Sequence, residues 1–249
     1  MTRQFILTSS MSKRLIGKAM AVHPAVQAVL KKGTLVIVAG TTNGYVAEEV
    51  LLATSQAARF NRKGFRRGMV TPPGAGAPKA DFPGDVVLID GAWQRGKEIF
   101  DVVDTMQSGD LILKGGNALD LATGRAAVLI GHPMAGTVGA AMPAVLGRRV
   151  QLIIPIGLEK RVPGPLEDIA ADLNAPGVEG PRMVVMPGKA FTELDAIRLL
   201  TGAVAQLVAA GGVHGAEGAV WLAVSGDDPH VRAAGELIQS VANEPACEA

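Results

Sequence analysis

Three short segments of the chain combine glycine with residues that can hold an anion or move a proton. The first is Gly40-Thr41-Thr42-Asn43-Gly44, which follows one apolar run and precedes another, so that it is expected to link a strand to a helix. Small residues let the backbone approach an anion, a helix N-terminus favours negative charge, and threonine hydroxyls add donors. The segment is predicted to bind a phosphate or similar anion, although the same residues would also serve simply to turn the chain.

The other two segments place a charged residue directly after an apolar run. Asp90 ends VVLID, and Lys114 ends LILK and is followed by Gly115, Gly116 and Asn117. Open α/β sheets bind ligands at the carboxyl ends of their strands. Asp90 is therefore predicted to orient a substrate or accept a hydroxyl proton, and Lys114 to neutralise an anion or polarise a carbonyl. The alternatives are a turn cap for Asp90 and a solvated strand end for Lys114.

Two further candidates lie in the second half of the chain. His132, in Gly131-His132-Pro133, could act as a general base, or it could be a hydrogen-bonded structural residue. Glu159 and Lys160 follow the apolar run at 150–156 and would bring a carboxylate and an ammonium to the end of a strand. A surface ion pair is the alternative for these two residues.

Composition excludes several classes of function. Lys and Arg number 24 and Asp and Glu 23, so the net charge of +1 offers no long-range field for nucleic acid, and no nucleic-acid partner is expected. The four histidines are widely spaced, and the single cysteine, Cys247, excludes CxxC motifs. We expect neither a metal site nor a cofactor.

No export signal is evident, and a disulfide-free chain fits a reducing cytoplasm. Residues 126–147 carry no formal charge over a length that could span a bilayer. His132, two prolines and several glycines interrupt this stretch, so a strand followed by a helix is predicted and no membrane partner is expected.

The elements that must position these residues alternate between short β-rich runs and longer Ala/Leu-rich runs, which predicts an α/β protein with a mainly parallel, Rossmann-like sheet flanked by helices. The predicted strands are Thr34–Ala39, Asp85–Ile89, Leu111–Lys114, Ala126–Ile130, Val150–Ile156, Arg182–Met186 and Ala219–Val224. The predicted helices are Ser12–Met20, Pro24–Lys31, Tyr45–Arg59, Ala135–Leu146, Phe191–Ala210 and Pro229–Val241. Residues 12–173 are expected to form the core and residues 182–249 a smaller α/β extension, while the proline-rich segment 64–84 is expected to be a long loop. The first ten residues indicate no element.

The order of the three glycine-containing segments resembles the ribose-5-phosphate isomerase A branch of the superfamily that also holds glucosamine-6-phosphate deaminases and CoA transferases. In that family the segments read like GTGST, DGADE and KGGGGAL, and here they read GTTNG at 40–44, DGAWQ at 90–94 and KGGNAL at 114–119. The resemblance covers about residues 12–135. It implies a phosphorylated sugar or related anion bound at the carboxyl edge of the sheet, with Asp90 and Lys114 matching active-site residues.

The chain departs from the family at two places. It has Trp93 where the isomerases have a second acid, and DLATGR at 120–125 where they supply a glutamate base. We therefore expect an isomerase-like enzyme acting on a small anionic metabolite, with a non-catalytic sugar-phosphate sensor as the alternative. CoA transferases of the superfamily use a nucleophilic glutamate, so acyl or CoA transfer through Glu159 is a second alternative. Runs of small residues such as AVAQLVAAGG indicate close helix–sheet packing, and one of them would equally suit a contact with a second subunit. A homo-oligomer is expected.

Overall fold

The structure, a computed structural model, describes residues 1–67 and 84–246. Most of the segment 64–84 and Cys247 lie outside these residues. The α/β class is confirmed. The helices are α1 (Ser9–Val22), α2 (Pro24–Lys31), α3 (Thr41–Ala53), α4 (Gly136–Met142), α5 (Leu166–Asn174), α6 (Glu193–Thr201) and α7 (Asp228–Ser240). The strands are β1 (Thr2–Leu7), β2 (Thr34–Ile37), β3 (Val86–Ile89), β4 (Ala92–Trp93), β5 (Leu111–Leu113), β6 (Ala118–Asp120), β7 (Arg125–Ile130), β8 (Gln151–Pro155), β9 (Arg182–Val185), β10 (Lys189–Phe191), β11 (Val204–Ala210) and β12 (Val220–Ser225).

The central sheet has six strands in the order β10-β8-β5-β2-β3-β4. Strands β10, β8, β5 and β2 run parallel, whereas β3 is antiparallel to β2 and β4 is antiparallel to β3. The uninterrupted apolar runs of β2 and β5 are buried, as expected for strands covered on both faces. The sheet is therefore mixed. Because β3 runs antiparallel to β2, the start of β3 lies at the edge where the parallel strands have their carboxyl ends.

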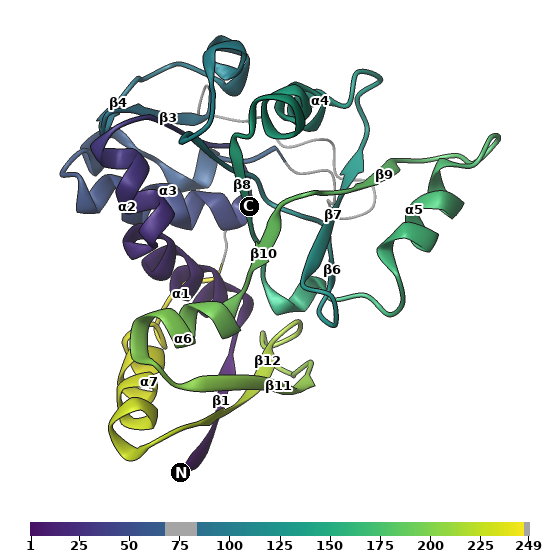
Figure 1. The fold of residues 1–249 in the computed structure, drawn as a ribbon. Coiled ribbons are helices and arrows are strands. Elements are labelled where there is room, and N and C mark those ends of the chain that lie inside the picture. The colour runs from purple at the N-terminus through teal and green to yellow at the C-terminus, as the bar shows by residue number, and fades with distance from the viewer. Residues whose placement is uncertain (68–83, 247–249) are drawn as a thin grey trace.

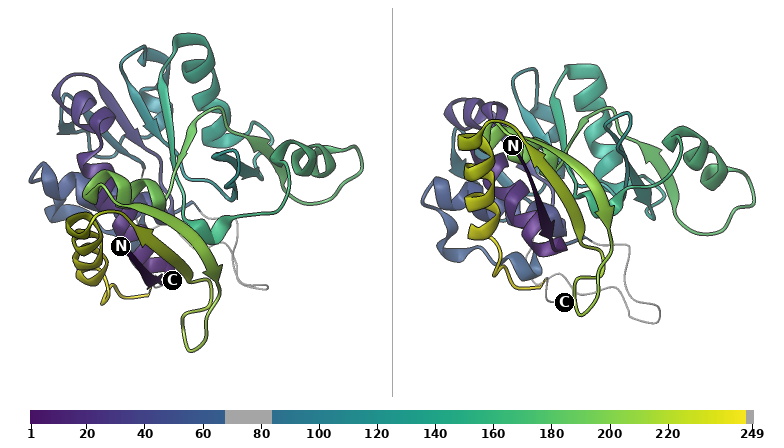
Figure 2. Two further views of the ribbon diagram at one scale, coloured as in Figure 1. Left: turned by 60° about the horizontal axis from the view of Figure 1, so that its bottom comes forward. Right: turned by 90° about the horizontal axis from the view of Figure 1, so that it is seen from below.

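A second sheet joins the two ends of the chain, in the order β1-β12-β11 (Figure 2). β1 lies within the first ten residues, for which the sequence indicated no element, and pairs antiparallel with β12. The prediction of a single helix over 191–210 is wrong. Gly202 adopts a left-handed conformation, with φ of 77°, that ends α6, and β11 then pairs with β12.

A third sheet, β6-β7-β9, packs against α5 and forms a lobe on the right of Figure 1. Its strand β9 follows the boundary expected near residues 174–181, and the next strand, β10, joins the central sheet. Strands from residues 182–249 therefore belong to all three sheets, and β1 joins the sheet of β11 and β12.

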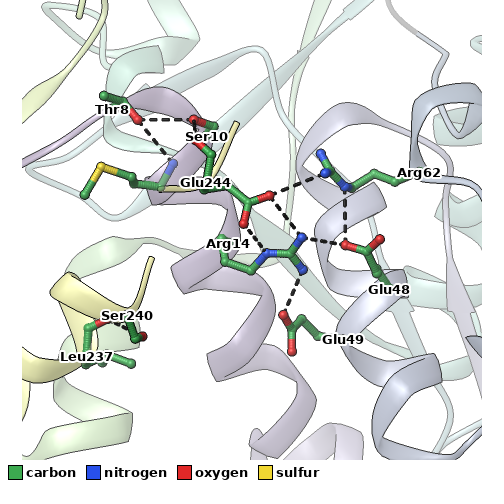
Figure 3. Close-up of polar contacts among 10 residues, drawn as sticks. Thr8, Ser10, Arg14, Glu48, Glu49, Arg62, Leu237, Ser240 and Glu244 are labelled. Carbon is green, nitrogen blue, oxygen red and sulfur yellow. Dashed lines mark hydrogen bonds and ion pairs between the residues drawn. The ribbon is translucent and has the colours of Figure 1, made fainter. Parts of the chain in front are cut away.

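Helix α1 packs closely on α3. A Cβ placed on Gly17 of α1 would lie 2.8 Å from the carbonyl oxygen of Tyr45 in α3, so only glycine permits this approach. Beside this contact Arg14 of α1 binds three carboxylates (Figure 3), those of Glu48 and Glu49 on α3 and that of Glu244 after α7, at 2.6 to 2.8 Å. The segment after α7 is thereby fixed to α1 and α3.

The uncharged stretch 126–147 does not form one long helix. It contains all of β7 but its first residue, then α4 and a π-helical turn at Pro143–Gly147. Among the residues that the structure describes, no helix combines the length and apolar character needed to cross a membrane.

Candidate functional site

A cleft of about 620 Å³ lies where β2, β5 and β8 end at their carboxyl edge. Each strand is followed by a segment that lines it: residues 39–43 after β2, 114–117 after β5 and 159–162 after β8. The start of α1 supplies Lys13, and the β11–β12 connection supplies Glu217. Nine of the twelve predicted site residues line this cleft, namely Gly40, Thr41, Thr42, Asn43, Lys114, Gly115, Gly116, Asn117 and Glu159.

The predicted anion-binding turn is the first turn of a helix. α3 begins at Thr41 rather than at Tyr45, with Gly40 as the N-cap, and its first intrahelical bond runs from the Gly44 N–H to the Gly40 carbonyl at 2.7 Å. The N–H groups of residues 41–43 precede that bond and have no partner inside the helix. The Thr42 side chain is 2% exposed, and its hydroxyl has no hydrogen-bond partner within the described residues.

Asn43 and Gly44 support this turn from behind. The Asn43 amide donates to the carbonyls of Val38 at 2.8 Å and Leu113 at 2.9 Å, which joins the ends of β2 and β5. Gly44 does not line the cleft, and a Cβ there would lie 3.0 Å from Cγ of Arg62. Both residues hold the start of α3 in place. The Asn43 amide nitrogen is already used in these two hydrogen bonds, and Gly44 lies outside the cleft, so neither group is free to bind a ligand.

Lys114 extends from the end of the central strand β5. Its backbone N–H donates to the Ile153 carbonyl at 3.1 Å, which fixes the side chain's base between β2 and β8. Its Nζ makes no hydrogen bond or ion pair with any residue that the structure describes. Burial, against the opposing charge of Asp85 and with the positive charges of Lys160 and Arg67, lowers the pKa of Lys114 to about 8.

Gly116 and Asn117 join the cleft to the third sheet. The Gly116 carbonyl accepts from Nζ of Lys160 at 2.8 Å, and Oδ1 of Asn117 accepts from the Leu129 N–H at 3.0 Å. A Cβ on Gly116 would lie 2.8 Å from Cδ1 of Ile156, so a larger residue there would have to displace that side chain. These residues shape the wall of the cleft.

Glu159 lies in the turn after β8 and is paired. Its Oε1 lies 3.3 Å from Nζ of Lys13, and its Oε2 is enclosed without a hydrogen-bond partner in the described part of the chain. Lys13 also donates to the carbonyl and the hydroxyl of Ser9. Glu193, next to this turn, is fully buried and accepts from the Leu158 N–H at 3.0 and 3.2 Å. Burial raises the pKa of Glu193 to about 7, and the charge of Glu159 adds to the shift.

The structure corrects the placement of Asp90. Because β3 is antiparallel to β2, the residue that follows β3 lies at the opposite edge of the sheet, where Asp90 is exposed and its Oδ1 accepts from the Gly33 N–H at 2.8 Å. Asp90 is thus a turn residue, as the alternative interpretation held.

Asp85, which precedes β3, occupies the carboxyl edge in its place. Its carboxylate is buried and accepts from the N–H groups of Ala39 at 2.8 Å and Ile99 at 2.9 Å, with Arg67 at 3.3 Å. Burial raises the pKa of Asp85 despite these partners. In the sequence, Asp85 can be recognised only as an acid directly before an apolar run. That position indicates a residue near the site only once the direction of the strand is known.

His132 lies outside the main cleft. It is exposed, and its Nδ1 accepts from the Met134 N–H at 3.1 Å. It lines a neighbouring hollow of about 290 Å³ that shares Ala39, Arg67, Lys114 and Asn117 with the cleft. The side chain therefore lies near the site, in a local structural hydrogen bond.

The groups that line the cleft suit an anion. Lys13, Arg67, Lys114, Lys160 and Arg161 supply cations, against the carboxylates of Glu159 and Glu217. Within residues 1–67 and 84–246 no three His, Cys, Asp or Glu side chains are grouped so that they could hold a metal ion. Comparison of the chain with protein-family models, with curated proteins and with solved structures finds no match.

Proposed function

We propose that the cleft binds a phosphorylated sugar or similar anionic metabolite, with the anion at the start of α3. The observation that carries the proposal is the buried Thr42 hydroxyl, which lacks a partner among the described residues at the place where unpaired helix N–H groups and Lys114 meet. A phosphate oxygen would satisfy these donors, and the helix dipole would favour its charge.

The arrangement of the parallel strands supports the interpretation of the cleft as a ligand site of a Rossmann-like sheet. β2 leads directly into α3, and the cleft lies at the carboxyl edge, where open α/β sheets bind ligands. The resemblance to the isomerase-like superfamily rests on the segments at 40–44 and 114–119 and no longer on Asp90.

The reaction that best fits this site is an isomerase-like conversion at a carbonyl group of the bound metabolite. Such a reaction needs a group that acts on the carbonyl and a group that moves a proton. Lys114 is placed for the first task. For the second, Glu159 supplies a carboxylate in the cleft, and Lys13 holds it in position.

Binding tests this proposal directly. We expect ribose 5-phosphate to bind more tightly than ribose by isothermal titration calorimetry. Thr42→Val should weaken binding about tenfold, and Lys114→Met by roughly tenfold to a hundredfold, because each removes a hydrogen bond to a charged group worth about 1.5–3 kcal/mol. Asp90→Asn is the matched control and should leave affinity unchanged, since Asp90 lies at the other edge of the sheet.

The opposite pattern would contradict the site. Equal binding of ribose and its phosphate, or loss of binding only in Asp90→Asn, would place the ligand elsewhere. A turnover assay on the same compounds separates the enzyme from its alternative, since a sensor would bind the phosphate ester and leave it unchanged.

We also propose that a second copy of the chain covers the outer face of the β1-β12-β11 sheet. The register aligns Ile6 with Trp221 and Ala209, and Gln4 with Ala223 and Gln206, so these two rows carry no charge. Ile6 is 47% and Trp221 41% exposed. Two copies of this face meet without like-charge repulsion, and an exposed tryptophan is a common anchor of interfaces.

Light scattering during size-exclusion chromatography checks the interface. The protein is expected to elute as a dimer, and Trp221→Lys should weaken the dimer at least tenfold because it buries an unpaired charge. Val178→Lys, at an exposed position of the α5–β9 connection, is the control and should leave the dimer intact. A monomeric wild-type protein at its highest soluble concentration would rule the interface out.

A further inference from the structure

We propose that Nζ of Lys114 forms a covalent imine with the carbonyl group of an anionic aldehyde or ketone bound in the cleft. The inference rests on the proposed function, because the anion site at the start of α3 must hold the ligand beside the amine. It adds a covalent step that simple polarisation of the carbonyl by a charged ammonium does not include.

The three lysines of the cleft differ in the hydrogen-bond and ion-pair partners of their Nζ atoms. Nζ of Lys13 contacts Ser9 and Glu159, and Nζ of Lys160 donates to the Gly116 carbonyl. Lys114 is half-buried, and its Nζ has no such partner in the described part of the chain. It also lines both the main cleft and the neighbouring hollow, so that a ligand in either space can reach it.

The base of the side chain is rigid. The Lys114 N–H is bonded to β8, and the Leu113 carbonyl just before it accepts from Asn43 of α3. The first contact fixes Lys114 to β8, and the second fixes the end of β5 to α3, the helix that carries the proposed anion site. Holding a nucleophile and its target in fixed positions removes much of the entropic barrier to their reaction.

The surroundings favour the uncharged amine, which is the nucleophilic form. Burial and the nearby charges of Arg67 and Lys160 lower the pKa of Lys114 to about 8, and Asp85 is the group that acts in the other direction. About half of the amine is then neutral at pH 8. Desolvation and a second cation are recognised means of activating a lysine for carbonyl chemistry.

The chemistry balances without any further reagent. The nitrogen lone pair attacks the carbonyl carbon, and one amine proton passes to the oxygen to give the carbinolamine. The carbon–oxygen bond then breaks as the hydroxyl group takes up the second amine proton and leaves as water, and a carbon–nitrogen double bond remains. No oxidant or reductant is consumed.

Reductive trapping tests the inference on the intact protein. The probe is pyridoxal 5′-phosphate, which carries an aldehyde and a phosphate, with pyridoxal as the uncharged comparison and sodium borohydride as the trap. After proteolysis, mass spectrometry should find the reduced adduct on Lys114 at least tenfold above Lys13, Lys160 and Lys97. Labelling should rise from pH 6.5 to pH 8.5, fall with pyridoxal, and be competed by ribose 5-phosphate.

Two substitutions separate the imine from the binding site. Lys114→Arg keeps a cation and cannot form an imine, so it should bind ribose 5-phosphate and lose the adduct. Lys97→Met, at an exposed position outside the cleft, should label on Lys114 as the wild-type protein does. Circular dichroism and thermal unfolding verify that both variants fold.

The failing outcomes are distinct. Phosphate-dependent binding with no adduct on Lys114, or an adduct spread evenly over exposed lysines, would overturn the imine and leave the proposed binding site standing. Absence of both the adduct and phosphate-dependent binding would overturn the proposed function as well.

Discussion

Replacing Arg14 by methionine is expected to lower the free energy of unfolding by about 3–5 kcal/mol, the usual cost of removing one partner from a buried charge cluster. The Arg14 side chain is 13% exposed and contacts Glu48, Glu49 and Glu244 (Figure 3). Burial lowers the pKa of Arg14, but the hydrogen bonds to the three carboxylates outweigh it and raise the pKa. Without the arginine, only Arg62 would remain to offset Glu48 and Glu244 in the described cluster.

Urea denaturation followed by circular dichroism measures the effect. Arg232→Met is the control, because its ion pair with Asp228 on α7 is largely exposed and should change the free energy of unfolding by less than about 0.5 kcal/mol. Adding Glu49→Gln to Arg14→Met should recover part of the loss by removing one of the uncompensated charges. A loss below 1 kcal/mol in Arg14→Met would mean that the cluster contributes little.

Glu193→Gln is expected to stabilise the protein at alkaline pH. It should also remove most of the dependence of the free energy of unfolding on pH that Glu193 causes. The pKa of Glu193 is raised from 4.5 to about 7 in the folded state, chiefly by burial. The folded protein therefore binds this proton more tightly than the unfolded chain does. Its contribution to stability is present below pH 4.5 and is lost as pH rises through 7, by about 3 kcal/mol in total.

The measurement is the free energy of unfolding at several values between pH 5 and pH 8.5 for both proteins. The free energy of unfolding of the wild-type protein minus that of Glu193→Gln should fall as pH rises. Groups present in both proteins, such as Asp85, cancel in this difference. Glu167→Gln is a suitable control, because Glu167 lies exposed at the start of α5 and should show no such trend. A difference that stays constant across the range would show that Glu193 keeps an ordinary pKa when folded.

Much of the site could be predicted from the sequence because the residues after β2 and β5 are local signals. A parallel strand that ends in glycine, threonine or lysine brings those residues to the carboxyl edge whatever the rest of the fold. The placement of Asp90 failed because strand direction is not a local property. Nothing in VVLID indicates that β3 runs antiparallel to β2, and that reversal puts Asp85 at the carboxyl edge of the parallel strands and Asp90 at the opposite edge.

The elements missed by the sequence interpretation depend on distant partners. β1 alternates weakly and becomes a strand because β12 supplies its hydrogen bonds. The apolar run of β11 fits a helix or a strand equally well by composition, and pairing with β12 decides the outcome. Gly202 was the one local signal for a break, since a glycine in the left-handed conformation commonly ends a helix.

The pairing of β1 with β12 has a consequence for synthesis on the ribosome. β1 emerges before its partner β12, so the nascent strand remains unpaired while the residues between the two strands are made. At about 5–20 residues per second this delay is on the order of ten seconds or more. An unpaired apolar strand would be prone to associate with neighbouring chains in that time. Thr2, Arg3 and Gln4 make the first half of β1 polar, which keeps the waiting segment hydrated until β12 emerges.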